Sequence, residues 1–432
     1  MTPDSLPSLD LPSGNRREIF AWALYDWANS AYSTLSITIL VYYLTKVVLP
    51  GRWGPVAWAW GISLSMLTAA VLSPILGAMA DASANKRRWL AGTALAGAGA
   101  AVLLAAVPPE MTWLVITLFV LTALGFELSI GFYNGFLPEI ADETTMNRIS
   151  AFGYALGYIG GAAALGLAVL VQIFGSRIGL PKLSDQLRVG LLILGLWWGG
   201  FTLPAIWVLR DRGKAPQQPV PWRRAVRRAV GEVRRSLGNV RQYRMLALFL
   251  LGFLFYNDGI QSVISQASTF AIMELKFETT ELILLILLIQ LVACPGATLV
   301  GRLADRIGQK AALHLCLAVW VGLIVTAFFI PNKTVFWFLG VLLALVLGGT
   351  QSVSRAIMGR MAPPGRTAEF FGFFNFSGKA TSFLGTFLFG LIIAVTGSAR
   401  WAVLSLLVFF LLGWAIVSRV DIQQGRRNAF GR

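Results

Sequence analysis

Charged residues are scarce in this sequence. Only 13% of its 432 residues are Asp, Glu, Lys or Arg, and 56% are hydrophobic, whereas a soluble domain carries about 25% charged residues. An ordinary soluble protein is therefore excluded. The only two cysteines, Cys294 and Cys316, fall in adjacent apolar segments, so no disulfide framework is visible. The single histidine, His314, provides no metal site and is expected to be a hydrogen-bonded packing residue.

Signatures of catalysis and of nucleotide binding are missing as well. The stretch GFFNFSGKAT has the wrong glycine spacing for a phosphate loop, and Ala380 stands where a Ser or Thr is needed. Glu127 and Glu139 have no candidate nucleophile or oxyanion site near them. We therefore expect no enzyme activity, no cofactor and no metal. Residues 1–15 lack a basic region and a small-residue cleavage site, which predicts a disordered tail and no cleaved signal.

Long apolar runs, by contrast, occur along nearly the whole chain. Each is about 20 residues long, enough to cross a bilayer as a helix, and the mean hydropathy is +0.69. A membrane β-barrel would show short alternating strands instead. The sequence predicts an all-α polytopic membrane protein with twelve spans, at residues 20–48, 56–80, 88–107, 112–135, 149–174, 186–209, 245–272, 281–304, 311–330, 334–358, 369–395 and 399–419.

The basic charge of the chain is unevenly placed. Its net charge is +16, and with the N-terminus inside, most of the 36 Lys and Arg fall in cytoplasmic segments. This asymmetry follows the positive-inside rule and predicts that both termini are cytoplasmic. The charge therefore reports topology and favours anionic lipid as a partner over nucleic acid. We expect an integral protein of a bacterial inner membrane, acting as a monomer.

The sequence repeats itself in two halves. GAMADASANK, which begins at Gly77, is echoed by GRLADRIGQK, which begins at Gly301. Asp26-x-x-Asn29-Ser30-x-x-Ser33 is likewise echoed by Asp258-x-x-Gln261-Ser262-x-x-Ser265. Two six-helix halves in parallel orientation are the arrangement of major facilitator transporters. We predict a first bundle at 16–209, a linker at 210–244, a second bundle at 245–420 and a cytoplasmic tail at 421–432.

The linker contains a basic amphipathic segment. Its apolar residues recur at helical spacing between arginines, at Trp222, Val226, Val230, Val233, Leu237 and Val240. This pattern predicts a helix suited to the membrane surface. The simpler alternative is a linker helix packed under the bundle.

Polar residues within the spans mark the predicted site. Asp26, Asn29, Ser30 and Ser33 share one helix face because they lie three and four residues apart, and the second stripe from Asp258 repeats this pattern. Such stripes can be polar contacts between packed helices, but a carboxylate at the head of each favours a hydrated pathway. The remaining pathway candidates lie in or beside the spans, at Tyr25, Glu127, Tyr133, Asn134, Asn257, Gln261, Ser262, Gln351, Arg355, Asn375 and Lys379.

A buried lysine near a buried carboxylate is usually a pair, since either group alone tends to neutralise. We therefore predict that Lys379 interacts with Asp258 or with Glu127, directly or through water.

The repeated loop motifs resemble a loop segment of the major facilitator superfamily, and that resemblance implies that they form a cytoplasmic gate. A carboxylate at the end of a span can accept hydrogen bonds from the free amides of a neighbouring helix N-terminus. GRLADRIGQK matches the major facilitator loop signature G-x-x-x-D-R-x-G-x-[RK] at every defined position, whereas the first copy has alanines where the arginine and second glycine belong. The role of the first copy in closing the gate is therefore open. The gate candidates are Gly77, Asp81, Lys86, Gly301, Arg302, Asp305, Arg306 and Lys310.

Several stretches resemble one narrower family. WALYDWANSAY, FYNGFLPEIAD, FLFYNDGIQS and AEFFGFFNFSGKATSFLG are similar to the family that contains the fungal autophagy-related vacuolar amino-acid effluxers and many bacterial relatives. The resemblance runs from about residue 16 to residue 420, without most of the linker. It implies twelve helices in two bundles, and it implies efflux of amino acids.

Together these features predict a secondary transporter of a small polar solute that works by alternating access. The carboxylates, amides and lysine agree with an amino acid or a similar zwitterion. Since no nucleotide-binding motif is present, an ion or substrate gradient must supply the energy, and proton coupling through Asp26 or Asp258 is our hypothesis. A lipid or lysophospholipid flippase of the same fold is the alternative, and a non-transporting receptor or scaffold is a further one.

Overall fold

The computed structural model describes residues 15–51, 53–142, 144–212, 222–238, 241–379 and 384–430. All regular structure in these ranges is helical, and twelve segments are long and apolar enough to cross a membrane. The twelve predicted spans are thus confirmed, with ends that differ by a few residues. The expected N-terminal tail lies outside the described residues, apart from Asn15, whose side chain caps the first helix at the amide of Glu18.

The first bundle comprises the described residues from Arg16 to Val208. Its first span starts as an α-helix and continues through two π-helical stretches to Val48. The elements are α1 (Arg16–Leu35), η1 (Ser36–Leu40), η2 (Tyr43–Val48), α2 (Trp53–Ser83), α3 (Lys86–Ala106), α4 (Thr112–Gly135), α5 (Leu137–Ile140), α6 (Met146–Phe174), η3 (Gly175–Ile178) and α7 (Leu183–Val208).

The second bundle follows the linker helix α8 (Trp222–Gly238). Its last span is made of two helices, α15 and α16, where the sequence predicted one, while the described parts of the eleventh span are α13 and α14. The elements are α9 (Arg244–Leu275), α10 (Thr279–Ile307), α11 (Gln309–Phe328), α12 (Lys333–Met361), α13 (Thr367–Lys379), α14 (Leu384–Thr396), α15 (Ala399–Ser405), α16 (Leu407–Ser418) and the short α17 (Ile422–Ala429).

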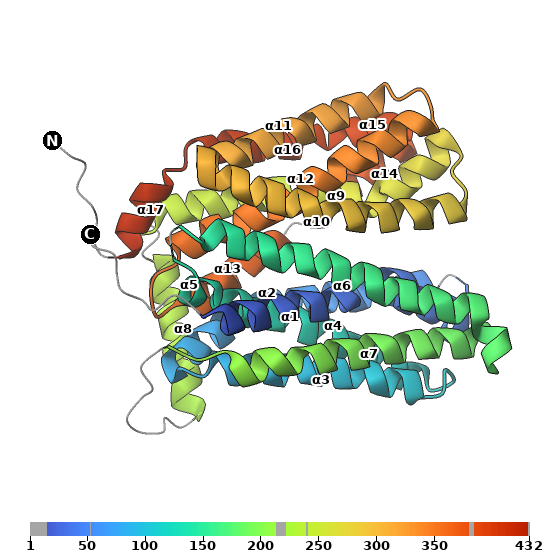
Figure 1. Ribbon diagram of the computed structural model, residues 1–432, viewed down its shortest axis with the longest axis horizontal. Coiled ribbons are helices and arrows are strands. Elements are labelled where there is room, and N and C mark those ends of the chain that lie inside the picture. Colours follow the sequence, from blue (N-terminus) through green and yellow to red (C-terminus); the bar gives the residue numbers. More distant parts are fainter. Residues whose placement is uncertain are drawn as a thin grey trace.

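The two bundles lie side by side, as Figure 1 shows, and each has its own hydrophobic core. The core of the first bundle also includes Ala356 of α12 and Ala368 of α13, so the second bundle contributes to it. The helices α8 and α17 lie at one end of the molecule, which we call the linker end (Figure 1). We call the opposite end the distal end.

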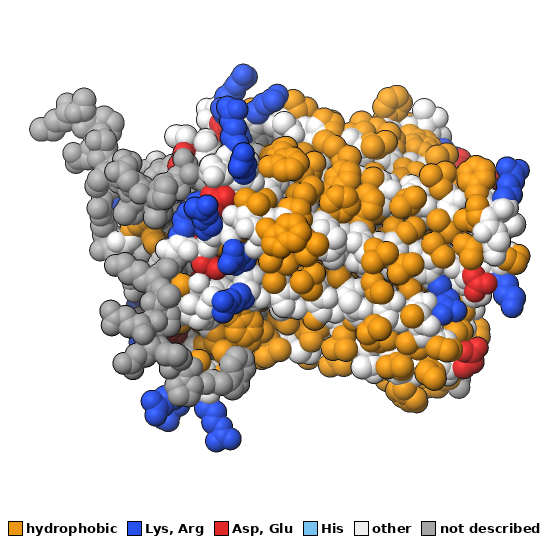
Figure 2. All heavy atoms as spheres, turned by 60° about the horizontal axis from the view of Figure 1, so that its bottom comes forward, with side chains coloured by type: hydrophobic (Ala, Val, Ile, Leu, Met, Phe, Trp, Pro, Cys, Tyr) orange, Lys and Arg blue, Asp and Glu red, His pale blue; other side chains and the backbone are white. Residues whose placement is uncertain are grey.

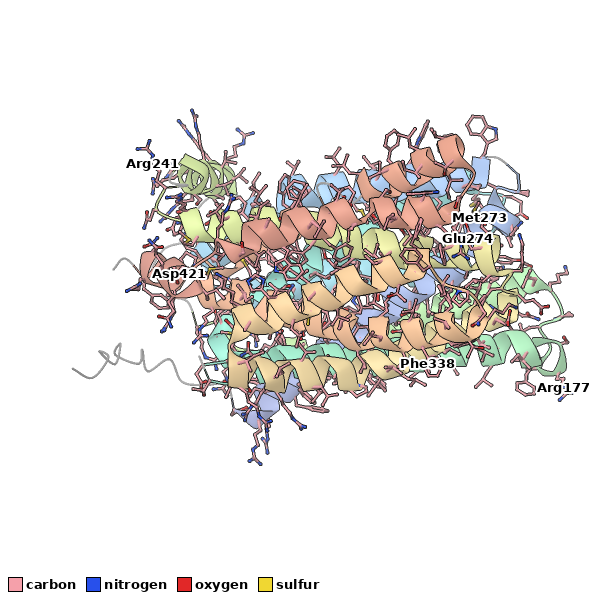
Figure 3. All side chains as sticks on the ribbon, turned by 90° about the horizontal axis from the view of Figure 1, so that it is seen from above. Arg177, Arg241, Met273, Glu274, Phe338 and Asp421 are labelled. Carbon is pink, nitrogen blue, oxygen red and sulfur yellow. The ribbon has the colours of Figure 1, made fainter. Side chains whose placement is uncertain are left out.

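The surface agrees with a membrane protein. Figure 2 shows a broad apolar band, with Lys and Arg gathered mainly toward the linker end and a smaller charged group at the distal end. Figure 3 labels Arg241 and Asp421 at the linker end, and Arg177 and Glu274 at the distal end. The apolar band between these charged ends is the surface expected to contact lipid tails.

The linker helix packs on the protein. Ala229 of α8 is buried against Ala78 and Met79 of α2, with Val226 and Val233 half-buried beside it. This contact follows the simpler of the two interpretations of the linker, a helix packed under the bundle. Val230 is exposed, while the side chains of Trp222 and Leu237 and all of Val240 lie outside the described residues.

Candidate functional site

A buried charge pair joins the two bundles. The carboxylate of Asp26 in α1 accepts a hydrogen bond from the Arg355 guanidinium in α12 at 2.8 Å and one from the Tyr133 hydroxyl in α4 at 2.7 Å. Only 7% of Asp26 and 1% of Arg355 is exposed. Charge-assisted hydrogen bonds of this kind offset the desolvation of both ions. We call these residues and their immediate neighbours the Asp26–Arg355 cluster.

Arg355 is held by several groups of the opposite bundle. The Ser150 carbonyl and hydroxyl in α6 accept hydrogen bonds from it at 2.6 and 3.0 Å, and Asn134 Oδ1 lies 3.4 Å from Nη1. The guanidinium also lies over two aromatic rings, 4.0 Å from the Tyr154 centroid and 4.8 Å from that of Trp22. Cation–π contacts add to the stabilisation of a desolvated arginine. The arginine of one bundle is therefore fixed by three helices of the other.

A second ion pair joins the bundles at Glu127 and Lys379. Lys379 Nζ of α13 lies 3.2 Å from Glu127 Oε1 of α4, and the Lys379 side chain is 29% exposed. Asn375, one turn earlier in α13, donates a hydrogen bond to the Glu127 carbonyl at 3.4 Å. The predicted partnership of Lys379 with Glu127 is therefore present as a direct contact. This pair is more accessible than the Asp26–Arg355 cluster.

Neutral hydrogen bonds add to the contact between the bundles. Tyr158 of α6 donates to Gln351 of α12 at 2.7 Å, and Gln290 of α10 donates to Thr34 of α1 at 2.9 Å. Gln290 was not among the predicted site residues, although a lone amide in the apolar run LILLILLIQLVAC is a signal that could have identified it.

The rest of the stripe in α1 changes from buried to exposed along the helix. Asn29 is buried, Ser30 is half-buried and Ser33 is exposed. Tyr25, by contrast, is fully buried and packs its ring 4.9 Å from that of Tyr133. Tyr25 therefore belongs to the core of the first bundle and not to an accessible surface.

The stripe in α9 does not mirror the stripe in α1. We expected Asp258 to face the space between the bundles, but it is only 1% exposed and accepts a hydrogen bond from the Gly385 amide of α14 at 3.1 Å. Ser262 is fully buried beside the same glycine, and Asn257 donates to the Gly378 carbonyl at 2.8 Å. These groups lie inside the second bundle because α9 turns this face toward α13 and α14. Gln261, half-buried, is the remaining member of the predicted set.

At the linker end, the first loop motif forms the helix cap that we expected at Asp305 of the second motif. Asp81 accepts hydrogen bonds from the backbone amides of Ala368 and Glu369 in α13, at 3.2 and 2.9 Å. Gly77 permits this approach, since a Cβ at that position would lie 2.4 Å from the Ala368 carbonyl oxygen. Lys86 is buried, pairs with Glu139 and donates to Thr367 at 2.8 Å. The first copy of the motif, GAMADASANK, thus makes the cap although it lacks the arginine and the second glycine of the signature.

The second loop motif makes a different contact. Asp305 accepts hydrogen bonds from the side chains of Asn147 and Arg148 in α6, at 3.0 and 2.5 Å. We expected backbone amides as its partners, but side chains at the start of α6 take that place. Gly301 packs on Ala151 of the same helix. Of the other predicted gate residues, Lys310 donates to the Ser418 carbonyl at 2.7 Å within its own bundle, while Arg302 and Arg306 are exposed.

The linker helix also takes part at this end. Ser236 of α8 donates a hydrogen bond to Glu369 Oε1 at 2.6 Å, and Arg366 donates two to the same carboxylate at 2.8 and 2.9 Å. Since α8 also packs on α2, it contacts both bundles beside the Asp81 cap. No pattern in the sequence indicated that Ser236 pairs with Glu369.

The ion pairs near the distal end lie within the second bundle. Glu281 pairs with Lys333 at 2.6 Å, and Glu274 pairs with Arg400 at 3.0 Å. In α14, which continues toward this end, only Gly385 and Phe389 are buried among the described residues. The polar contacts described above therefore join the bundles at the linker end and near the middle of the molecule. No three His, Cys, Asp or Glu side chains gather closely enough to hold a metal ion within the described ranges.

The fold and these contacts between two six-helix bundles define a major facilitator transporter. Among solved structures, the chain is similar to the human organic anion transporter MFSD10 (TETRAN), with a TM-score of 0.70, 14% identity and coverage of 93% of this chain and 99% of that one. It is also similar to the proton:xylose symporter XylE, with a TM-score of 0.71, 13% identity and coverage of 94% and 95%. These two likenesses show that the chain has the major facilitator fold.

The chain belongs to the family described as "Vacuole effluxer Atg22 like", whose model matches residues 59–430. It is 31% identical over 406 residues to the uncharacterized MFS-type transporter YxiO of Bacillus subtilis, covering 93% of this chain and 94% of that protein. It is 29% identical over 304 residues to autophagy-related protein 22 of Cryptococcus neoformans, covering 66% of this chain and 52% of the fungal one. The resemblance noted in the sequence is confirmed.

Proposed function

We propose that this protein transports a small zwitterion, such as an amino acid, by alternating access of a site between its two bundles. The observation that carries this proposal is the Glu127–Lys379 pair, which places opposite charges of the two bundles 3.2 Å apart with the lysine partly accessible. A zwitterion can replace this pair, with its ammonium on Glu127 and its carboxylate on Lys379. It would then separate two groups that hold the bundles together, which links binding to the conformational change.

The Asp26–Arg355 cluster has a different role in this proposal. It lies between the same bundles but is almost completely buried, so we assign it to closing the linker end and not to holding the solute. We propose that the linker end faces the cytoplasm of a bacterial cell, because Lys and Arg gather there. The conformation described here then has its cytoplasmic side closed, and efflux requires the linker end to open.

A proton gradient is our proposed energy source. Both Asp26 and Asp258 are buried carboxyl groups in spans. Protonation of Asp26 would weaken its bond to Arg355, whereas Asp258 has an oxygen, Oδ1, without a hydrogen-bond partner in the part of the chain described. Either carboxyl group could therefore carry a coupling proton.

The experiment begins with a thermal-shift screen of amino acids on the purified protein, because a ligand of the native state raises the melting temperature. A hit should lose its shift in Glu127→Gln and in Lys379→Gln. The matched controls are Glu281→Gln and Lys333→Gln, which break an ion pair of the same type within the second bundle. These two variants should keep the shift.

Transport is then measured by counterflow in proteoliposomes, with and without an imposed pH gradient. A hit that shifts the melting temperature equally in all four variants would place its binding elsewhere and overturn the proposed site. Transport that ignores the pH gradient in the wild-type protein would overturn proton coupling while leaving the zwitterion site intact.

A further inference from the structure

An apolar groove lies on the lipid-facing side of the first bundle, between α3 and α4. Its volume is about 430 Å³. Figure 1 places α3 along the edge of the first bundle that is farthest from the second bundle, so the groove between α3 and α4 lies away from the contact between the bundles. The proposed transport does not use it.

Small residues of α3 produce this hollow. Gly125 of α4 approaches Gly97 of α3 so closely that a Cβ on Gly125 would lie 2.7 Å from the Gly97 Cα. Beside this crossing, Gly92 and Ala96 leave the outer side open, and a Cβ on Gly92 would meet no atom within 4 Å. Leucines of α4 form the opposite wall. The groove therefore fits a narrow apolar chain.

The groove has charge only at the end nearer the start of α3. Arg88 lines it there, two residues after Lys86 begins the helix, and its exposed guanidinium has no partner among the described residues. Thr93, the other polar group apart from the adjacent Trp89, donates its hydroxyl to the Trp89 carbonyl at 2.8 Å. The charged group that the groove offers to a ligand is thus the Arg88 guanidinium. A ligand that satisfies both ends has a long apolar part and an anionic head.

The position of the groove in the membrane agrees with such a ligand. From Arg88 to Ala96 the helix rises about 12 Å, at about 1.5 Å per residue. This is close to half of a hydrocarbon core of about 30 Å. The apolar part therefore spans one leaflet, with Arg88 at the level of the lipid headgroups. Basic residues at the mouths of grooves between membrane helices are suited to anionic headgroups.

We propose that this groove binds an anionic phospholipid of the linker-end leaflet, with one acyl chain between α3 and α4 and its phosphate on Arg88. Phosphatidylglycerol then binds in preference to phosphatidylcholine with the same acyl chains. A single Lys or Arg near an anionic surface contributes about 1 kcal/mol, which corresponds to a preference of about fivefold. The proposal is independent of the transported solute.

The test is native mass spectrometry of the full chain, with phosphatidylglycerol, phosphatidylcholine of identical chains, or inorganic phosphate added. Arg88→Ala should reduce phosphatidylglycerol retention to the level of phosphatidylcholine. Gly92→Leu should reduce retention of both lipids, because the new side chain enters the groove. Inorganic phosphate alone should give no retained adduct, because it lacks the acyl chain.

The chain offers a matched control for each variant. Gly99 lies on the same helix outside the groove and, like Gly92, has open space around its Cβ, so Gly99→Leu should retain lipid as the wild type does. Arg224 is an exposed arginine of α8, and Arg224→Ala should leave the preference unchanged. Equal retention of both lipids by the wild-type protein would overturn the proposal. So would wild-type phosphatidylglycerol retention in Arg88→Ala or in Gly92→Leu.

Discussion

Replacing Arg355 by methionine should open the linker end of this transporter. Arg355 donates hydrogen bonds to Asp26 and Ser150, and its loss leaves the Asp26 carboxylate buried with the Tyr133 hydroxyl as its remaining donor in the described structure. Breaking a buried ion pair on one side costs about 3–5 kcal/mol. Opening the linker end would expose the lone carboxylate to water and relieve much of this cost, so the penalty falls on the closed state.

The size of the effect follows from this energy. Since about 1.4 kcal/mol is tenfold in an equilibrium constant, the ratio of open to closed molecules should rise by about a hundredfold to a few thousandfold. The double variant Asp26→Asn/Arg355→Met removes both charges and should restore most of the closed population, because replacing both partners of a buried pair is far less costly.

The assay is a distance measurement between spin labels on the two bundles at the linker end. Arg17 of α1 and Arg306 of α10 are exposed and can be replaced by cysteine, in a background in which Cys294 and Cys316 are replaced by alanine. Arg355→Met should add a population at longer distance that the double variant lacks. If the single and double variants both give the wild-type distribution, the reasoning about this charge pair is refuted.

Three further perturbations at the linker end can be followed with the same pair of labels. Gly77→Ala should favour the open state, because the added Cβ would meet the backbone of α13 at 2.4 Å; a wild-type distribution would contradict the close approach. Asp81→Ala should also favour opening, by about 1–2 kcal/mol through loss of the helix cap, whereas Asp305→Ala should have a smaller effect because the arginine that it pairs with is 68% exposed. If Asp305→Ala increased the open population as much as Asp81→Ala or more, this would count against a stabilising helix cap at Asp81. Ser236→Glu should open the linker end more than Ser236→Ala, because a second carboxylate is placed beside Glu369; identical behaviour of the two would remove α8 from the gate.

Much of the fold could be read from the chain because its signals are local. A run of about 20 apolar residues indicates a span wherever it packs, so the twelve spans were predicted with small errors at their ends. Two refinements were missed for a related reason. The division of the last span into α15 and α16 cannot be predicted from a continuous apolar run. The change from α-helix to π-helix in the first span cannot be predicted from it either.

The site was predicted as a set of residues but not as a set of contacts. Intramembrane charge is costly and therefore conspicuous, so Asp26, Arg355, Glu127 and Lys379 could be singled out from the sequence alone. Only Lys379 was expected to form a pair, with either Asp258 or Glu127 as its partner. Ser150 and the rings around Arg355 carried no signal, because serine and aromatic residues are common in packed membrane helices.

The sequence by itself determined the membrane class, the number of spans and the repeated halves, since these depend on composition and spacing along the chain. The tertiary structure decided that Asp26 meets Arg355 across the bundles while its counterpart Asp258 meets an amide within one bundle. Helices of similar sequence pattern can be rotated differently about their axes, and each residue turns the helix by about 100°. The rotation is set by packing against neighbouring helices, so equivalent carboxylates at equivalent positions find different partners.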